Sequence, residues 1–387
     1  MKRWLVLIAS IVMQSCLGAV YAWSTFVPAL NQEYGIHSGR TGLIFGVCIA
    51  SFTVSMVFGG ALQRKYGPRR IGAAGGLLFL TGYLIGSFSA GNFLVLLAGF
   101  GVIAGAGIGF GYVCPLATSV RWFPRHKGLI TGLTVAGFGL GSVFFSKAAL
   151  IWLEKGIPVL DILRGLGLLV GTIVVLASCF LSRPATTHQV LPEKNTEFPL
   201  SKILKLNEFK SLFFMIFCGT FGGLLVIGNL KPIGLSLALS ATQATFAVML
   251  FAAGNAAGRI IWGVVYDRFG ARIITWCMLL LAVGAGSLGL SEGLSGFYLS
   301  TLLVAFSFGG CFVLFAARVA DAFGAHRFGE IYPFIFLGYG IAGLIGPAAG
   351  GMLLNYSGSP SLASAVVVAV ALIGAITAKL YCVSKIN

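Results

Sequence analysis

The chain has 387 residues, of which 58% are hydrophobic and only 9% are charged. Soluble globular domains carry about 25% charged residues, so the composition excludes a water-soluble enzyme, a nucleic-acid-binding module and a disordered regulator. The formal net charge of +16 would suggest a nucleic-acid partner in a soluble protein. Here the basic residues lie in short loops between apolar segments, which is typical of an integral membrane protein.

Twelve apolar segments are long enough to cross a bilayer, which takes about 20 residues each. Lys2, Arg3 and the apolar stretch after them resemble a secretory signal. Because no small-residue cleavage site interrupts that stretch before Leu30, we expect a retained first helix. The predicted spans are, to within a few residues, about 4–30, 41–62, 71–90, 93–120, 128–152, 165–182, 211–230, 242–266, 273–291, 297–320, 331–353 and 361–381.

The basic residues also predict an orientation. With the N-terminus inside, 20 of the 26 Lys and Arg residues fall on the cytoplasmic side, five fall outside and Arg259 alone lies within a span. This bias predicts a multi-pass protein of the cell inner membrane with both termini in the cytoplasm.

A polar stretch at 183–210 separates the spans into two groups of six. We therefore predict an N-terminal bundle at 1–182, a cytoplasmic linker at 183–210 and a C-terminal bundle at 211–387. A short amphipathic helix is expected near 200–209. The eight cysteines show no CxxC spacing, so the sequence predicts no metal site, and we expect no cofactor.

The two halves repeat. Gly60, Gly67 and Arg69 after the second span match Gly263, Gly270 and Arg272 after the eighth at an offset of 203. At the starts of spans 5 and 11, a second set matches at an offset of 201, namely Gly128, Gly137 and Gly139 with Gly329, Gly338 and Gly340. Two six-helix halves in a parallel repeat are a construction of secondary transporters. The predicted fold is therefore an all-α polytopic membrane protein with twelve transmembrane helices in two pseudo-symmetric bundles.

The second loop copy, Asp267-Arg268-Phe-Gly270 followed by Arg272, resembles the cytoplasmic loop motif of the major facilitator superfamily. The resemblance implies a gating role for this loop and for Gly67 and Arg69 of the first copy. The first copy departs from the motif, because Arg64 stands where the family usually has Asp.

A closer resemblance covers nearly the whole chain. Four motifs are similar to the oxalate/formate exchanger and monocarboxylate transporter group. They are Tyr21-Ala-Trp23, the block from Arg121-Trp-Phe-Pro to Gly128 with Ala136-Gly-Phe-Gly-Leu-Gly141, Phe221-Gly-Gly-Leu-Leu with Asn229, and Arg259 ahead of Asp267. The resemblance implies a carrier of small organic anions.

Arg259 is the candidate substrate-binding residue. It precedes the first charge after span 8 by eight residues, which places it roughly 12 Å inside the span. A basic residue at mid-helix costs about 2.5–3.5 kcal/mol, and no Asp or Glu lies deep in any predicted span. A guanidinium can bind a carboxylate through two hydrogen bonds. Alternatively, Arg259 caps helix-terminal carbonyls.

Depth counting suggests further site residues. Tyr339 in span 11 and Tyr112 in span 4 lie at the level of Arg259, and a phenol can donate to a carboxylate while its ring packs on an apolar tail. Asn255 lies one helical turn before Arg259 and can orient it. Tyr21, Trp23 and Asn229 lie in the outer halves of their spans and are candidates for an outer wall or gate.

The departures from the family narrow the substrate. The exchanger type pairs the span 8 Arg with a Lys in span 11, where this chain has Tyr339, so a single deep cation favours a monoanion. The proton-coupling Asp of the animal monocarboxylate carriers is replaced by Asn255. A coupled proton or counter-anion therefore stays open, as does symport or antiport.

The leading hypothesis is a monomeric carrier of a small organic anion, a monocarboxylate, that works by alternating access around Arg259 in the lipid bilayer. An alternative of the same architecture is efflux or uptake of a larger amphipathic compound such as a drug or siderophore. A membrane receptor or enzyme would need a sensory domain or catalytic cluster, and the sequence shows neither; nucleic acid is not an expected partner.

Overall fold

The computed structural model describes residues 2–184 and 199–383, and every regular element within them is helical. The elements of the first half are α1 (Lys2–Leu17), α2 (Trp23–Tyr34), α3 (Ser38–Tyr66), α4 (Pro68–Ser87), α5 (Phe93–Leu96), α6 (Gly105–Trp122), α7 (Lys127–Glu154) and α8 (Val159–Ser178). Those of the second half are α9 (Leu200–Ile203), α10 (Asn207–Ser236), α11 (Ala241–Phe269), α12 (Ile273–Gly289), α13 (Leu294–Ala322), α14 (Phe328–Ser357) and α15 (Pro360–Ala378).

These helices form twelve segments of membrane-spanning length in the described chain, which confirms the predicted fold class. Ten stretches are long and apolar enough to cross a membrane, and one of them, Thr242–Gly289, contains both α11 and α12. Counting that stretch as two and adding the 20-residue helix α4 gives twelve. The first span joins α1 to α2, and the fourth joins α5 to α6.

Two spans are interrupted. A 3₁₀ turn, Gly18–Ala22, separates α1 from α2, and a π-helical segment, Leu97–Ala104, separates α5 from α6. At the first interruption Gly18 packs against the backbone of α7, where a Cβ would collide with the carbonyl oxygen of Phe138. Only a residue without a side chain permits that approach.

Helix starts and ends follow local chemistry. Gly67, with φ of +87°, ends α3, and Pro68 occupies the first turn of α4, where its missing N–H costs nothing. Ser240 begins α11 with a capping box, because its hydroxyl accepts from the Gln243 amide at 3.2 Å while the Gln243 side chain accepts from the Ser240 amide at 2.9 Å. Such signals fix the register of the spans that carry the site.

The chain forms two compact units. Unit 1 is drawn from Met1–Pro124, Leu133–His188 and Phe323–Pro333, and unit 2 from Arg125–Gly132, Gln189–Ala322 and Phe334–Asn387, as far as these ranges are described. Each unit thus takes one short segment from the other half of the sequence, containing the first residues of α7 in unit 2 and of α14 in unit 1. The predicted division at 182 and 211 stays a prediction.

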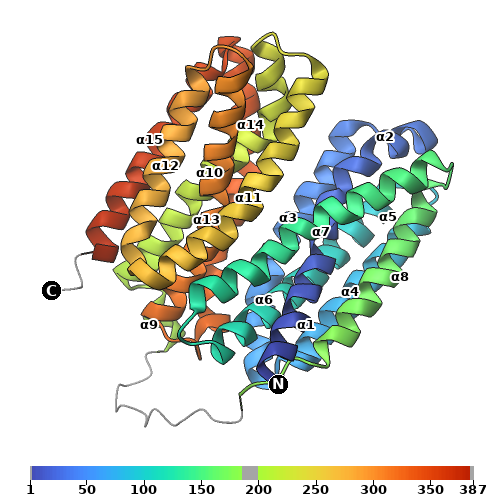
Figure 1. Ribbon diagram of the computed structural model, residues 1–387. Helices are drawn as coiled ribbons and strands as arrows, with labels where there is room; N and C mark the ends of the chain where they lie inside the picture. Colours follow the sequence, from blue (N-terminus) through green and yellow to red (C-terminus); the bar gives the residue numbers. More distant parts are fainter. Residues whose placement is uncertain (1, 185–198, 384–387) are drawn as a thin grey trace. The chain divides into compact units, whose positions relative to one another are not determined.

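Within the units, helix packing repeats. In unit 1, α3 packs on α6, and α4 packs on both α6 and α8. In unit 2 the corresponding helices make the same pairs, since α11 packs on α13, and α12 packs on both α13 and α15. Figure 1 shows the helices of each unit running side by side. The internal repeat predicted from glycine spacing is therefore present in the packing.

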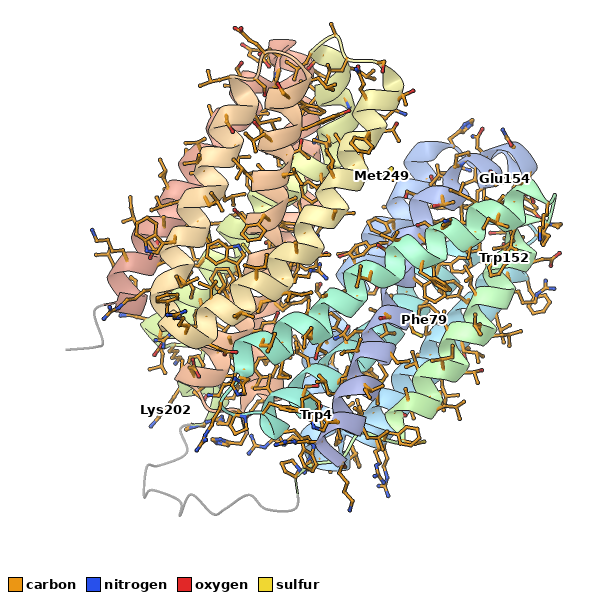
Figure 2. The ribbon with its side chains drawn as sticks, in the orientation of Figure 1. Trp4, Phe79, Trp152, Glu154, Lys202 and Met249 are labelled. Carbon is orange, nitrogen blue, oxygen red and sulfur yellow. The ribbon has the colours of Figure 1, made fainter. Side chains whose placement is uncertain are left out.

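Large apolar side chains cover much of the surface (Figure 2). Met249 is 64% exposed and Trp4 is 53% exposed, whereas Phe79 is fully buried. The charged residues Glu154 and Lys202 lie at or near helix ends. Extended apolar surface marks contact with lipid or protein rather than water, and the helical backbone satisfies its own hydrogen bonds, as a bilayer requires.

The structure describes only part of the predicted linker, because residues 185–198 of the 183–210 segment lie outside the described residues. Near the expected amphipathic helix at 200–209, the structure has the four-residue helix α9, and α10 begins at Asn207. The expected helix is thus divided between a single turn and the first turn of the seventh span.

Candidate functional site

Arg259 lies in α11 of unit 2, ten residues before the helix ends, and is 3% exposed. Its Nε donates a hydrogen bond to Oδ1 of Asn255 at 3.0 Å. Its guanidinium carbon lies 4.9 Å from the ring centroid of Phe312 on α13, a cation–π distance. The structure thus brings Asn255 and Arg259 together as their spacing predicts. The hydrogen bond to Asn255 and the ring of Phe312 both position the guanidinium.

Tyr339 of α14 joins this group through Phe312. It is 2% exposed, and its ring centroid lies 5.2 Å from that of Phe312 and 4.9 Å from that of Phe336. Arg259 and Tyr339 therefore contact the same aromatic ring. We call Arg259, Asn255, Phe312 and Tyr339 the arginine cluster.

Phe312 was missed by the sequence reasoning. The available signal was a pair of glycines just before it, Gly309 and Gly310. A Cβ on Gly309 would collide with the carbonyl oxygen of Asn255, so α13 approaches α11 at backbone contact beside the arginine. Small residues at helix interfaces permit such close approach in membranes.

Tyr112 belongs to unit 1 and lies in a second group of aromatic residues. It is 2% exposed, with its ring centroid 5.1 Å from Phe52 and 5.3 Å from Phe138. Phe138 also contacts Tyr21, at 5.4 Å and nearly edge-on. Tyr21 and Tyr112 thus both contact the ring of Phe138. We call Tyr21, Phe52, Tyr112 and Phe138 the aromatic cluster.

Trp23 and Asn229 use their polar atoms on backbone carbonyls. The indole N–H of Trp23 donates to the carbonyl of Thr41 at 2.9 Å, and its ring lies 5.4 Å from Phe100 rather than beside Tyr21. The Nδ2 of Asn229 donates to the carbonyls of Leu225 at 2.9 Å and Pro347 at 3.0 Å. These bonds hold α2 to α3 and α10 to α14.

The second loop copy forms a tight helix crossing in unit 2. Asp267 at the end of α11 accepts hydrogen bonds from the amides of Gly128 at 2.7 Å and Leu129 at 2.8 Å, in the first turn of α7. A Cβ on Gly263 would collide with the carbonyl oxygen of Gly128. We call this contact of α11 with α7 the unit 2 crossing.

The neighbouring loop residues have local contacts. The guanidinium of Arg268 lies 5.4 Å from the ring centroid of Phe269, and Arg272 completes a 3₁₀ turn that begins at Gly270, whose φ is +68°. Close to the same crossing, Lys127 pairs with Asp321 at 2.6 Å, and Asp321 accepts from the Tyr266 hydroxyl at 2.8 Å.

The first loop copy forms the corresponding crossing in unit 1, between α3 and the first turn of α14. A Cβ on Gly60 would collide with the carbonyl oxygen of Gly329. Arg64, at the position equivalent to Asp267, pairs with Glu330 at 2.5 Å, and Arg327 pairs with the same carboxylate at 3.2 Å. We call this contact the unit 1 crossing. Beyond it, the Arg69 Nε donates to the Leu181 carbonyl at 2.8 Å.

The described residues contain no group of three or more His, Cys, Asp or Glu side chains that could hold a metal ion. Among the Asp, Glu, Lys and Arg residues of the described chain, only Arg259 is buried. The arginine cluster presents hydrogen-bonding groups and aromatic rings.

Comparisons agree with a transport fold. The family model described as Major Facilitator Superfamily matches residues 6–227 and 212–384, so the chain belongs to that superfamily of membrane transporters. Among relatives, it is 30% identical over 350 residues to the uncharacterized MFS-type transporter YhjX of Escherichia coli, covering 88% of this chain and 86% of that one.

The chain is also 27% identical over 369 residues to the oxalate:formate antiporter of Oxalobacter formigenes, covering 92% of this chain and 86% of that protein. Among solved structures, the proton:xylose symporter XylE superposes with a TM-score of 0.76 at 14% identity, over 97% of this chain and 94% of that one. The resemblance to the superfamily and to its oxalate/formate and monocarboxylate group is thereby confirmed.

Proposed function

We propose that this transporter carries a small organic monocarboxylate across the membrane by alternating access, with Arg259 binding the carboxylate. The observation that supports the proposal most is the position of Arg259, a charged side chain 3% exposed in the middle of a membrane helix. A charge at that depth costs about 2.5–3.5 kcal/mol, and intramembrane ionisable residues mark substrate pathways. The relative named as an antiporter of two small carboxylates supports the same substrate class.

The contacts of Arg259 suit carboxylate binding. Its Nε is held by Asn255, so an end-on pair through the two Nη atoms is the geometry that this hydrogen bond permits. Paired N–H donors match the two oxygens of a carboxylate. The ring of Phe312 supports the guanidinium on one face, which limits the side-chain entropy lost on binding.

The charge of the cluster favours one carboxylate over two. Arg259 is the one ionisable residue of the arginine cluster that is positively charged at neutral pH, and the span 11 position that holds Lys in the exchanger type is Tyr339. In the proposal, Tyr339 donates to the substrate and Tyr112 of the aromatic cluster packs on its tail. Tyr21, Trp23 and Asn229 remain predicted wall or gate residues, and Asp267, Arg268, Gly270, Arg272, Gly67 and Arg69 remain predicted gating residues.

The proposal includes an orientation. In the proposal both termini lie in the cytoplasm, which the four-to-one bias of basic residues supports, and the chain works as a monomer in the cell inner membrane. Transport in the proposal is either facilitative or coupled to a proton or a counter-anion.

The test is uptake of labelled formate, acetate, pyruvate and oxalate into proteoliposomes containing the full chain. Arg259→Gln is expected to lower uptake of the best substrate about a hundredfold, since two charge-assisted hydrogen bonds are lost. Arg259→Lys keeps the charge but lacks the paired donors, so its uptake is expected to lie between that of the parent protein and that of Arg259→Gln. Tyr339→Phe is expected to cost about tenfold.

The matched control is Arg70→Gln, because Arg70 is an exposed arginine near the start of α4. Gel-filtration profile and melting temperature show whether each variant folds. Full uptake by a folded Arg259→Gln protein would remove the site assignment. Uptake of a larger amphipathic compound alone, across a panel that includes siderophores and drugs, would favour the alternative function.

A further inference from the structure

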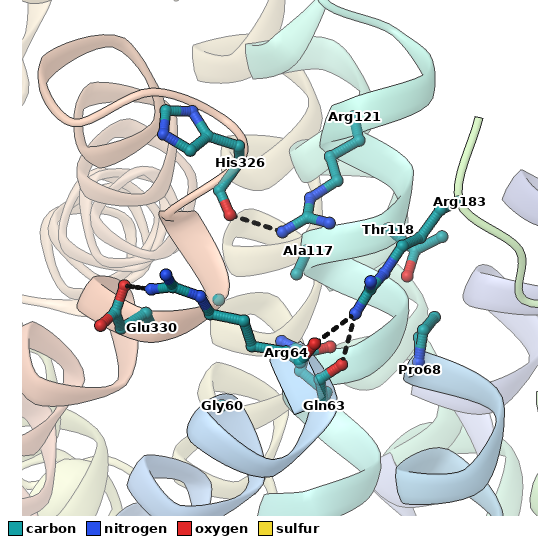
Figure 3. A pocket seen from close by; sticks show the side chains of 11 residues that line it. Gly60, Gln63, Arg64, Pro68, Ala117, Thr118, Arg121, Arg183, His326 and Glu330 are labelled. Carbon is teal, nitrogen blue, oxygen red and sulfur yellow. Dashed lines mark hydrogen bonds and ion pairs between the residues drawn. The ribbon is translucent and has the colours of Figure 1, made fainter. Parts of the chain in front are cut away.

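A small recess in unit 1 is lined by more positive than negative groups. It is enclosed by the ends of α3 and α6, the first turn of α14 and the segment after α8 (Figure 3). Its polar lining includes Arg64, Arg121, Arg183, Gln63, His326 and Glu330. Three of these side chains are guanidiniums and one is a carboxylate, which leaves a formal excess of two positive charges.

The carboxylate is engaged at one side of the recess. Glu330 pairs with Arg64 at 2.5 Å and also with Arg327 at 3.2 Å. It therefore balances the charges of the unit 1 crossing rather than those of Arg121 and Arg183, with which it forms no ion pair among the described residues.

The other two arginines donate to neutral oxygens. Arg121 donates to the carbonyls of Ala325 at 3.2 Å and His326 at 2.5 Å, while Arg183 donates through Nη2 to the carbonyls of Gln63 at 2.7 Å and Arg64 at 2.9 Å (Figure 3). Carbonyl oxygens fix the position of a guanidinium without neutralising its charge. Two guanidiniums are thus held at the wall of one recess in the way that phosphate sites hold arginines.

A buried donor supplies a second, independent observation. Gln63 is 6% exposed, and its Nε2 has no hydrogen-bond partner among the described residues. A buried polar group without a partner costs about 1–3 kcal/mol, and each such group in a native structure calls for an explanation. An acceptor within the recess would provide one.

We propose that this recess binds a doubly charged phosphate-type oxyanion through Arg121, Arg183 and Gln63. The anion neutralises the charge excess and accepts from Gln63. The shared chemistry is a phosphomonoester or inorganic phosphate, and its source is either the cytosol or the headgroup of a phosphomonoester lipid. Because the recess is bordered by α3, α6 and the first turn of α14, the bound anion stabilises the unit 1 crossing.

The test measures the melting temperature of the purified full-length protein in detergent with increasing sodium phosphate, against sodium chloride at matched ionic strength. A ligand that binds the folded state raises the melting temperature with its concentration. We expect phosphate to raise the melting temperature specifically. The apparent affinity for phosphate should fall about tenfold in Arg183→Gln and also about tenfold in Gln63→Met, each compared with the parent protein. Arg70→Gln is the matched arginine control, and its response to phosphate should equal that of the parent protein.

Two arms decide the source and the independence of the site. In the first, the melting temperature is compared in phosphatidylcholine nanodiscs with and without phosphatidic acid. A rise that needs phosphatidic acid and is lost in Arg183→Gln indicates that the bound phosphate belongs to a lipid. Arg259→Gln should keep the phosphate response, because Arg259 lies in unit 2, so this inference can fail while the transport proposal stands, and the reverse. No specific effect of phosphate or phosphatidic acid, or an effect that survives in folded Arg183→Gln and Gln63→Met proteins, overturns the proposal.

Discussion

The unit 1 and unit 2 crossings share a backbone arrangement and differ in charge. In both, a glycine near the end of one helix meets a glycine in the first turn of another, Gly60 with Gly329 and Gly263 with Gly128. In the unit 2 crossing an acid, Asp267, accepts hydrogen bonds from two backbone amides of the opposing helix. In the unit 1 crossing the equivalent residue is a base, Arg64, and the acid stands on the opposing helix as Glu330.

The difference teaches which feature the repeat preserves. Both crossings place a carboxylate at a helix N-terminal turn, where the helix dipole favours negative charge. In unit 2 it comes from the crossing helix, and in unit 1 it comes from α14 itself. The close contact of two backbones constrains both positions to glycine, whereas the carboxylate can come from either helix when its partner changes accordingly.

The largest expected effect tests the shared backbone contact. Gly60→Ala is expected to destabilise the protein by about 3 kcal/mol, because the added Cβ meets a backbone oxygen that cannot move aside cheaply. Gly42→Ala in the same helix is the matched control, since nothing lies within 4 Å of its Cβ. That variant is expected to gain up to about 1 kcal/mol from helix propensity. Melting temperatures in detergent at one scan rate compare them; equal shifts would show that the crossing is not a tight contact.

An intermediate effect tests whether the two charge arrangements are interchangeable. Glu330→Leu is expected to cost about 2 kcal/mol, less than a fully buried pair, because the Arg64 side chain is 52% exposed. Adding Arg64→Asp recreates in unit 1 the acid and the leucine of the unit 2 crossing. The pair of changes is expected to recover about 1 kcal/mol through the amides of the first turn of α14.

The double-mutant cycle is measured by melting temperature, with Arg64→Asp alone as the fourth corner. That single variant sets two acids side by side and should be less stable than the parent protein. Additive effects in the cycle would mean that the crossings do not exchange their charge patterns.

The smallest effect concerns the unit 2 crossing. Asp267→Asn is expected to cost about 1 kcal/mol, the typical value of an N-terminal helix cap, because the amide accepts less strongly and Asp267 is exposed. Glu154→Gln, at the other end of α7, removes a carboxylate that is exposed and far from the first turn. The loss of stability in Asp267→Asn should exceed that in Glu154→Gln at low salt. The difference between the two variants should become smaller at 1 M salt. No difference at low salt would contradict the capping role.

The sequence predicts features that depend on spacing along one helix. The twelve spans follow from apolar length, and the hydrogen bond of Asn255 to Arg259 follows from positions four apart. The glycine offsets predict two similar halves, and glycines of both matched sets lie at the two crossings in the structure.

Features that depend on packing between helices were not predictable in the same way. Phe312 reaches Arg259 from α13, and the glycine pair before it indicates a close helix approach without showing which of the 32 phenylalanines contacts the arginine. Glu330 lies 266 positions from Arg64, and only the departure of Arg64 from the family pattern indicated that the first crossing would be built differently. The 3₁₀ and π-helical interruptions come from backbone packing, which apolar length does not encode.

The 3₁₀ turn in the first span has a geometric consequence for residue facing. A 3₁₀ helix advances about 120° per residue and an α-helix about 100°, so the five residues of Gly18–Ala22 rotate the following helix by about 100° relative to an unbroken span. Tyr21, within the turn, contacts Phe138, and Trp23, the first residue after it, contacts Phe100. A helical wheel drawn through the whole span would assign the wrong side of α2 to lipid, and labelling or crosslinking positions there must be counted afresh from Trp23.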